Sequence, residues 1–206
     1  MLHSKTKHFK SYFSTAFLFV VFSSMSACNK EKVDKALIES EDKEYLVHAN
    51  EATDLLAKRL GGQLKAALES GGPEAGIEIC QQIGQSLTQS TNNELDGMTV
   101  TRTSLKIRNP LNAPSPKDKE IMMQWQKQLE KNGKLPESEV VHQEDQSPVV
   151  YKPIITQKVC MKCHGNPSTF SPELTSLIKK HYPDDQATGF TEGSIRGAFK
   201  VIFPKR

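Results

Sequence analysis

The motif Cys160-Met161-Lys162-Cys163-His164 limits the fold and the chemistry of this chain more than any other stretch of its 206 residues. Two cysteines that stand two residues apart, with a histidine directly after the second, form the attachment site of a c-type heme. Their sulfurs can bond to the vinyl groups of the porphyrin, and the next residue then lies where its imidazole can bind the iron. The sequence therefore predicts that Cys160 and Cys163 hold heme c covalently and that His164 is an iron ligand.

A Cys-x-x-Cys pair has two other common uses. Half of a zinc site would need a second pair of ligands, which the sequence does not supply. A redox dithiol would follow a strand and open a helix, whereas Gly165 and Pro167 interrupt the chain directly after the motif. Heme attachment is therefore the preferred interpretation.

The first residues have the pattern of an export signal. Three lysines precede an apolar run at residues 12–22, and small residues and Cys28 follow it. This is the order of a secretory signal, and the run is shorter than the ~20 residues of a permanent membrane span. The tetrad Met25-Ser26-Ala27-Cys28 resembles the bacterial lipobox, in which the cysteine becomes the lipid-bearing first residue. Ordinary signal cleavage nearby is the alternative.

We therefore expect three segments: a signal peptide at residues 1–27, a lipidated tether at residues 28–39 and one domain at residues 40–206. The lipid on Cys28 would anchor the protein to a bacterial membrane on the periplasmic side. Asn29, rather than aspartate, favours the outer membrane under enterobacterial sorting.

Charge excludes a nucleic-acid role. The signal contains three of the 27 basic residues and none of the 24 acidic ones, so the mature chain is formally neutral. No basic cluster is interleaved with aromatic residues, as a nucleic-acid surface would require.

Cys80 is left without an assigned partner. Export leads to an oxidising compartment, and the other three of the four cysteines are assigned to lipid or heme. An apolar periodicity predicts a helix over residues 73–90, with Cys80 on its apolar side. The thiol is then either a small buried group or an iron ligand opposite His164.

The rest of the chain predicts an α+β fold. Helical periodicity covers residues 35–70, where Gly61 and Gly62 allow a kink, and Gly71-Gly72-Pro73 separates this helix from the next. His48 on the first helix is more simply explained as a solvated side chain than as an iron ligand. A third helix begins after Ser115 and ends at Gly133, with Trp125 in the core.

Strand patterns lie mostly in the second half. The expected strands are residues 98–107, residues 149–155, where Pro153 indicates a sheet edge or a strand end, and residues 193–204. Residues 140–146 are ambiguous between strand and loop, and residues 172–180 form a short helix.

Several short motifs together are characteristic of one family. They are Ile77-Glu78-Ile79-Cys80, Arg102-Thr103-Ser104, Arg108-Asn109-Pro110-Leu111-Asn112, Cys160 to Gly165, Tyr182-Pro183-Asp184, Gly189-Phe190 and Gly197. Over residues 40–204 the chain resembles a c-type heme domain family, typified by a small cyanobacterial monoheme protein and used as the sensory input of some histidine kinases. The resemblance implies a PAS-like antiparallel sheet with flanking helices, a long N-terminal helix and one covalent heme. It also implies iron ligation by Cys80 and His164. Since the chain shows no transmitter domain, a kinase role is not implied.

The expected function is electron transfer or redox sensing by an exported monoheme protein, with a redox partner protein that the sequence does not identify. A thiolate ligand lowers the reduction potential, and two protein ligands leave no open position for catalysis, so we expect no enzyme. Arg102 and Arg108 could bind the heme propionates. The alternatives are a cytochrome with a methionine ligand (Met98, Met122, Met123 or Met161) and a gas sensor or peroxidase-like protein with an open iron position.

Overall fold

The computed structural model describes residues 21–145 and 147–205, with side chains from residue 37 onward. Most of the predicted signal peptide lies outside these ranges, and the side chain of Cys28 is not described. Within the two ranges, no helix combines the length and the apolar character needed to cross a bilayer. The chain divides into two compact units, residues 1–41 and 42–206. The second unit contains all of the sheet.

A glycine pair breaks the first helix, α1 (Val21–Asn92), into two parts. Gly72 has a φ of 70° and a ψ of −161°, a conformation that only glycine adopts readily, and Pro73 then starts the second part. From residue 42 onward the two parts contact each other: the Arg59 guanidinium donates a hydrogen bond to the Thr91 hydroxyl at 3.2 Å. The predicted pair of helices is confirmed. The kink that Gly61 and Gly62 allow does not form, because both glycines are helical.

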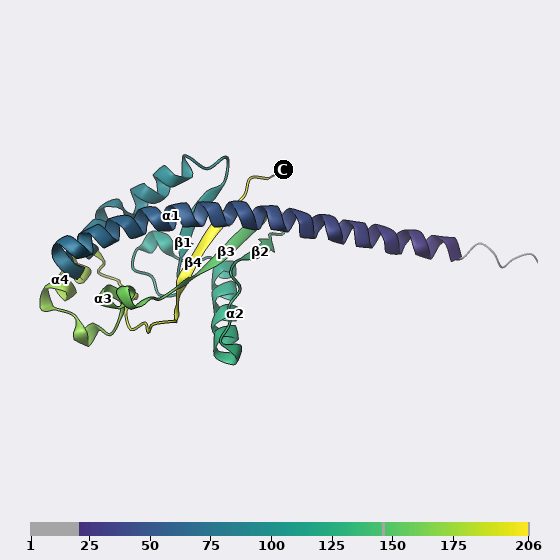
Figure 1. Ribbon diagram of the computed structural model, residues 1–206. Helices are drawn as coiled ribbons and strands as arrows, with labels where there is room; N and C mark the ends of the chain where they lie inside the picture. Colours follow the sequence, from purple (N-terminus) through teal and green to yellow (C-terminus); the bar gives the residue numbers. More distant parts are fainter. Residues whose placement is uncertain (1–20, 146, 206) are drawn as a thin grey trace, which may run out of the picture. The chain divides into compact units, whose positions relative to one another are not determined.

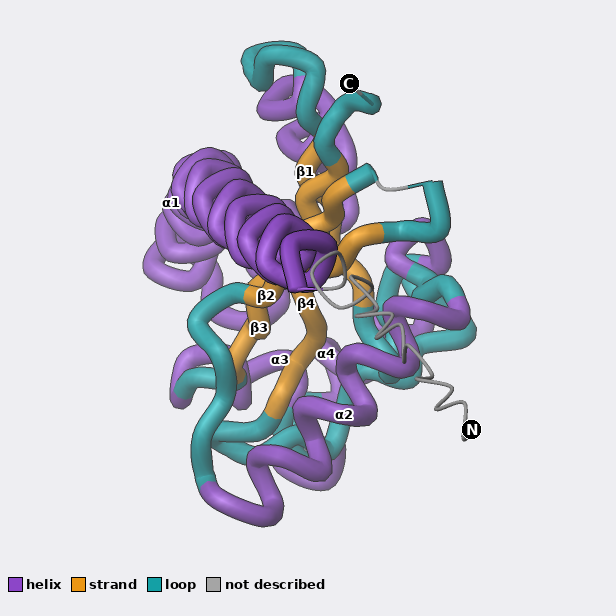
Figure 2. Tube along the Cα trace, turned by 90° about the vertical axis from the view of Figure 1, so that its right-hand side faces the viewer, coloured by secondary structure: helices purple, strands orange, loops and turns teal. Residues whose placement is uncertain are grey.

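Four strands form one antiparallel sheet in the order β1-β4-β3-β2 (Figures 1 and 2). Their bounds are β1 Thr99–Thr103, β2 Glu139–His142, β3 Pro148–Ile155 and β4 Ile195–Ile202. The ambiguous segment at residues 140–146 is therefore strand at residues 140–142 and loop or turn at residues 143–145. Pro153 lies beyond the stretch of β3 that pairs with β2. Proline has no N–H to donate, and on that side no neighbouring strand needs one. This agrees with its expected place at a sheet edge or a strand end.

Each face of the sheet is covered by a different helix (Figure 2). On one face, Leu56 and its neighbours on α1 pack on Val100, Val150 and Val201. On the other face, Trp125 of α2 (Pro116–Asn132) packs on Tyr151. Neighbouring residues such as Val150 and Tyr151 point to opposite faces because side chains alternate along a strand. Trp125 is fully buried, as predicted.

The heme-type motif lies in a chain of short elements between β3 and β4. These are the 3₁₀ turn at Lys158–Cys160, α3 (Met161–His164), a further 3₁₀ turn at Pro167–Thr169, and α4 (Pro172–His181). A third apolar cluster joins α4 to the second part of α1 through Leu174, Ile178 and Ile77. The predicted fold class, α+β with a long N-terminal helix and an antiparallel sheet, is confirmed. The fold brings the motif next to the helix that carries Cys80.

Candidate functional site

A cavity of about 540 Å³ opens on the face of the sheet that α1 covers. Both parts of α1 contribute walls, together with β1, β3, β4 and the segment that carries the Cys-x-x-Cys-His motif. Most of the walls are apolar, from side chains such as Leu64, Ile83, Ile154 and Phe199. Cavities of about 300–1,000 Å³ with apolar walls and a few polar groups are typical of sites for small molecules and cofactors.

Cys160, Cys163 and His164 all line this cavity. They come from one tight segment, in which the backbone amide of Gly165 donates to the Met161 carbonyl at 3.1 Å. A side chain at Gly165 would place its Cβ 2.6 Å from the same carbonyl oxygen, so only glycine fits there. The local sequence therefore forces the two thiols and the imidazole into one compact turn.

The imidazole of His164 has a fixed orientation. Its Nδ1 lies 2.6 Å from the Ala187 carbonyl oxygen. Because a carbonyl only accepts hydrogen bonds, Nδ1 carries the hydrogen and Nε2 keeps a free lone pair. Burial, and then the charges of Arg196 and Arg108, hold the pKa of His164 well below its usual value. The accessible part of the ring faces the cavity, so the residue is partly exposed yet strongly desolvated. A neutral imidazole with a free Nε2 is the form that binds metals.

Cys80 reaches the same cavity from the second part of α1. Its thiol is exposed to this cavity. Desolvation by the cavity walls raises the pKa of the thiol, and the charges of Arg102 and Arg108 oppose that shift. Burial likewise raises the pKa of the Cys163 thiol to about 11. The structure thus brings Cys80 and His164, which are far apart in the sequence, to one space. Sequence patterns place Cys80 only on an apolar helix side.

Arg102 and Arg108 both line the cavity but have different partners. The Arg102 guanidinium donates from Nη2 to the Gly84 carbonyl at 3.0 Å, and its buried Nε has no hydrogen-bond partner. Arg108 is held by Asp185, with nitrogen–oxygen distances of 3.0 and 2.9 Å. Only Arg102 therefore keeps a buried donor for a ligand. The carboxylate-binding role predicted for both residues stays a prediction.

A third arginine, Arg196, lines the cavity although the sequence motifs do not predict it. It lies at the register shift between β3 and β4, where Ile154 pairs with Gly197 and Ile155 with Ile195, so Arg196 is the extra residue of a bulge. Such bulges redirect side chains. Nothing in the local sequence shows where a strand pairing will slip, so this residue could not have been found by pattern alone.

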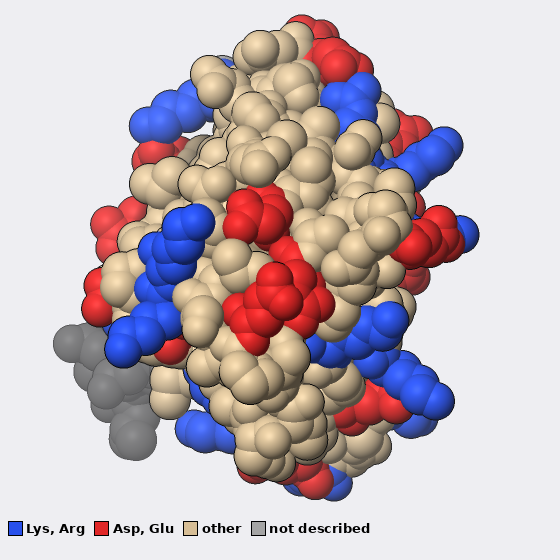
Figure 3. Space-filling view, turned by 90° about the vertical axis from the view of Figure 1, so that its left-hand side faces the viewer, with Lys and Arg blue, Asp and Glu red and all other residues tan. Residues whose placement is uncertain are grey.

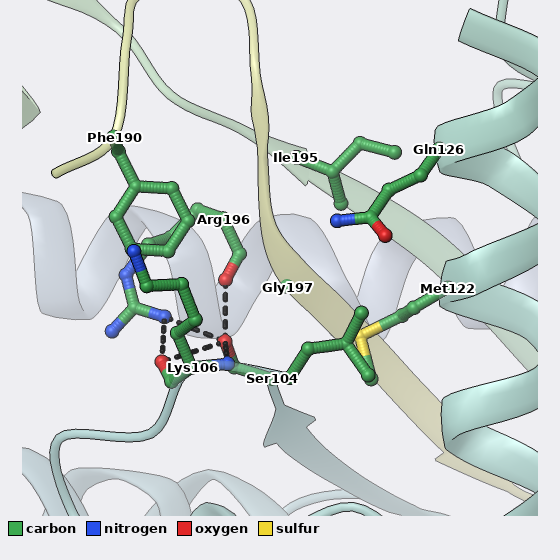
Figure 4. Close-up of a pocket in the computed structure, with 9 residues that line it drawn as sticks. Ser104, Lys106, Met122, Gln126, Phe190, Ile195, Arg196 and Gly197 are labelled. Atoms are coloured by element: carbon green, nitrogen blue, oxygen red, sulfur yellow. Dashed lines mark hydrogen bonds between the residues drawn. The ribbon is translucent and has the colours of Figure 1, made fainter. Parts of the chain in front are cut away.

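Arg196 lines both the large cavity and a smaller pocket of about 20 Å³, which Figure 4 shows. Its Nη1 donates to Ser104 Oγ at 2.8 Å and to the Lys106 carbonyl at 3.2 Å, and its centre lies 5.1 Å from the Phe190 ring. Burial lowers the pKa of Arg196 to about 10, so it remains a cation at neutral pH. Among the residues that the structure describes, no carboxylate lies within ion-pair distance of Arg196 or Arg102.

The other sequence-based candidates for an iron ligand do not line the cavity. His48 is about half exposed and lies near Glu44 and Glu51. Met122 is buried beside Trp125 on the opposite face of the sheet. Met98, Met123 and Met161 are likewise missing from the described cavity walls. A methionine-ligated site is therefore not supported by this arrangement.

Comparison with known proteins identifies the family. The family model for Tll0287-like proteins matches residues 19–204. The chain belongs to the Tll0287-like family. A solved structure described as the cyanobacterial heme-protein Tll0287 matches with a TM-score of 0.56 and 23% sequence identity, covering 81% of this chain and 96% of that one. No curated protein sequence matches this chain significantly.

Membership of the Tll0287-like family confirms the resemblance that the short motifs indicate. The match also confirms the fold, since nearly all of the solved Tll0287 chain is covered. At 23% identity, this structural match supports the architecture alone.

Proposed function

We propose that this chain is a c-type heme protein. Cys160 and Cys163 would form the two thioether bonds, and His164 would bind the iron through Nε2. The observation that carries the proposal is that these three residues and Cys80 line one cavity. Further support comes from the similar fold of a protein described as a heme protein.

The cavity suits a heme in its size and in its charge. Its volume is about 540 Å³ and most of its walls are apolar, which fits a large flat macrocycle. Arg102 and Arg196 are cations without an acidic partner among the described residues, and the buried Nε of Arg102 lacks an acceptor. A buried cation and a buried unpaired donor are costly unless a ligand compensates them. The two carboxylates of a heme would do so.

Cys80 is the proposed iron ligand opposite His164. A thiolate donates electron density to iron and lowers its reduction potential. With protein groups on both sides, the bound heme would exchange electrons rather than activate a substrate. We therefore infer electron transfer or redox sensing, without an enzymatic role. Arg102 is a proposed propionate partner, and the geometry adds Arg196. Arg108, which the sequence predicts for the same role, is already paired with Asp185.

The deciding experiment compares ferric wild type with Cys80→Ala, both expressed with a c-heme maturation system. Low-temperature EPR and optical spectra should show low-spin thiolate ligation in the wild type and its loss in the variant. Cys80→Ser is a second variant that keeps the size of the side chain. A heme stain after denaturing electrophoresis should show covalent attachment that Cys160→Ala/Cys163→Ala abolishes.

Each other result points elsewhere. A low-spin spectrum that does not change in Cys80→Ala would exclude Cys80 as the ligand. A high-spin wild type would mean an open iron position and would favour the alternative function, a gas sensor or a peroxidase-like protein. Failure to form covalent heme would refute the proposal as a whole.

We also propose that the mature protein is exported and anchored by a lipid on Cys28, facing the periplasm, with the outer membrane as the preferred site. Support comes from the lipobox-like sequence before Cys28. Cys28→Ala should move the protein from the membrane fraction to the soluble fraction and remove labelling by radioactive palmitate. A redox partner is expected but not identified. On the face drawn in Figure 3, acidic side chains gather near the centre and basic side chains lie mainly toward the edges.

A further inference from the structure

A buried ion pair lies directly behind the proposed iron ligand. The side chains of Arg108 and Asp185 are only 7% and 6% exposed. Arg108 donates from Nε and Nη2 to the two carboxylate oxygens at 3.0 and 2.9 Å. A two-point pair of this kind fixes the orientation of both groups.

The same pair contacts the backbone of Ala187, whose carbonyl accepts a hydrogen bond from His164. Arg108 Nη2 lies 3.4 Å from the Ala187 carbonyl oxygen, which also accepts from His164 Nδ1 at 2.6 Å. Asp185 Oδ1 accepts from the Ala187 backbone amide at 3.0 Å. Arg108 Nη2 further donates to the Cys163 carbonyl at 2.8 Å. The ion pair thus contacts the amide and carbonyl of Ala187 and the heme motif itself.

Further backbone hydrogen bonds hold the segment after Asp185 in place. The Gln186 amide donates to the Ile107 carbonyl at 2.8 Å, next to Arg108 in the chain. The Phe190 amide donates to the His164 carbonyl at 3.0 Å. The carbonyl of Ala187 therefore has little freedom to turn away from the imidazole, and Ala187 itself is fully buried.

On the basis of the proposed heme function, we propose that Arg108 and Asp185 are positioning residues that fix the tautomer and the ring orientation of His164 through the Ala187 carbonyl. A hydrogen bond from the outer ring nitrogen makes a metal-binding histidine more basic. A more basic ligand favours ferric over ferrous iron and so lowers the reduction potential. The pair would thus tune the potential without contact with the iron. This role explains why Arg108, unlike Arg102, has its own carboxylate partner.

The test uses heme-bearing protein and two substitutions that conserve charge. Arg108→Lys keeps the cation, but an ammonium group cannot reproduce the two-point pair and reach both carbonyls. Asp185→Glu keeps the anion but changes its reach by one methylene. Both variants should have a more positive reduction potential than the wild type and shifted EPR g values. In the diamagnetic ferrous state, the NMR signal of His164 Nδ1–H should exchange faster with solvent.

Matched controls separate this effect from a general loss of stability. Arg59→Lys alters another two-point ion pair, and Asp54→Glu alters another carboxylate pair, and neither residue lines the cavity. Both controls should keep the wild-type potential, g values and exchange rate. Wild-type values in Arg108→Lys or Asp185→Glu would overturn the positioning role. A wild type without covalent heme would instead refute the proposed function, so the two failures are distinguishable.

Discussion

Arg59 and Glu94, which are 35 residues apart, form a two-point ion pair across the fold-back of α1, with nitrogen–oxygen distances of 2.9 and 2.7 Å. The pair joins the first part of the helix to the turn that follows the second part. An exposed ion pair contributes little to stability, on the order of 0–1 kcal/mol. The return of the chain therefore depends on the glycine pair at its turn and on the apolar contacts below it. The fold-back brings Cys80 to the cavity.

Gly72→Ala should destabilise the protein by about 1–3 kcal/mol, because a φ of 70° with a ψ of −161° is accessible almost only to glycine. Gly62→Ala is the matched control on the same helix, with no atom near the new methyl group. It should be neutral or stabilise by up to about 1 kcal/mol. Urea unfolding followed by circular dichroism measures both. Equal unfolding midpoints for the two variants would contradict the special role of Gly72 in the break of α1.

Leu56→Ala should lower the free energy of unfolding by about 2–5 kcal/mol. Leu56 is fully buried between α1 and the sheet, so its removal leaves a cavity in the core. Val47→Ala on the same helix is the control, because Val47 is 56% exposed and its loss should change stability by less than about 0.5 kcal/mol. A cost for Val47→Ala similar to that of Leu56→Ala would show that this face of α1 is covered in solution.

Stability should fall in acid partly because of Asp118. Burial opposes its charge, but hydrogen bonds from Lys200, the Ser115 amide and Tyr151 prevail and lower the pKa of its carboxyl below 3.8. The unfolded chain therefore binds more protons there, so this stabilisation is complete above that value and is lost as the pH falls through the lower, folded-state pKa. Unfolding free energies between about pH 2 and 6 should fall less steeply in Asp118→Asn than in the wild type. Equal pH slopes would exclude Asp118 as a source of acid sensitivity.

Arg102→Met should affect the heme-free and heme-bearing forms in opposite directions. In the heme-free chain the substitution removes a buried unpaired Nε, so the thermal unfolding temperature should stay equal or rise. With heme bound it removes a proposed propionate partner, so that temperature should fall. Arg59→Met, away from the cavity, should change both forms by the same small amount. If Arg102→Met changed the thermal unfolding temperature of both forms in the same direction, Arg102 would not be a partner of the heme carboxylates.

The helices and most strands are predictable because their signals are local. Ser115 and Gly133 bound α2 as expected, with a capping box between Ser115 and Asp118 and a left-handed Gly133. The first strand is shorter than predicted, because Ser104 leaves the ladder to bond the Arg196 carbonyl at 2.7 Å. Alternation of residue types cannot reveal such a long-range competitor.

The candidate site was predictable only where one motif contains it. Cys160, Cys163 and His164 are visible as a motif, and Cys80 stands out as an unassigned thiol and by resemblance to the family. The partner of Arg108 is not predictable from the sequence. Asp185 lies 77 residues away and approaches only after α4 and its loop are in place. Arg196 depends on a slip in strand pairing, and such a slip is set by tertiary packing.

The walls of the cavity come from segments spread between residues 57 and 199. No local unit of the chain can form such a space, and contacts between remote segments form late because long loops must close first. A rigid planar group would therefore join the chain more readily while these walls are still apart than after they have closed. In biosynthetic terms, the architecture would suit a protein that is completed around the proposed heme.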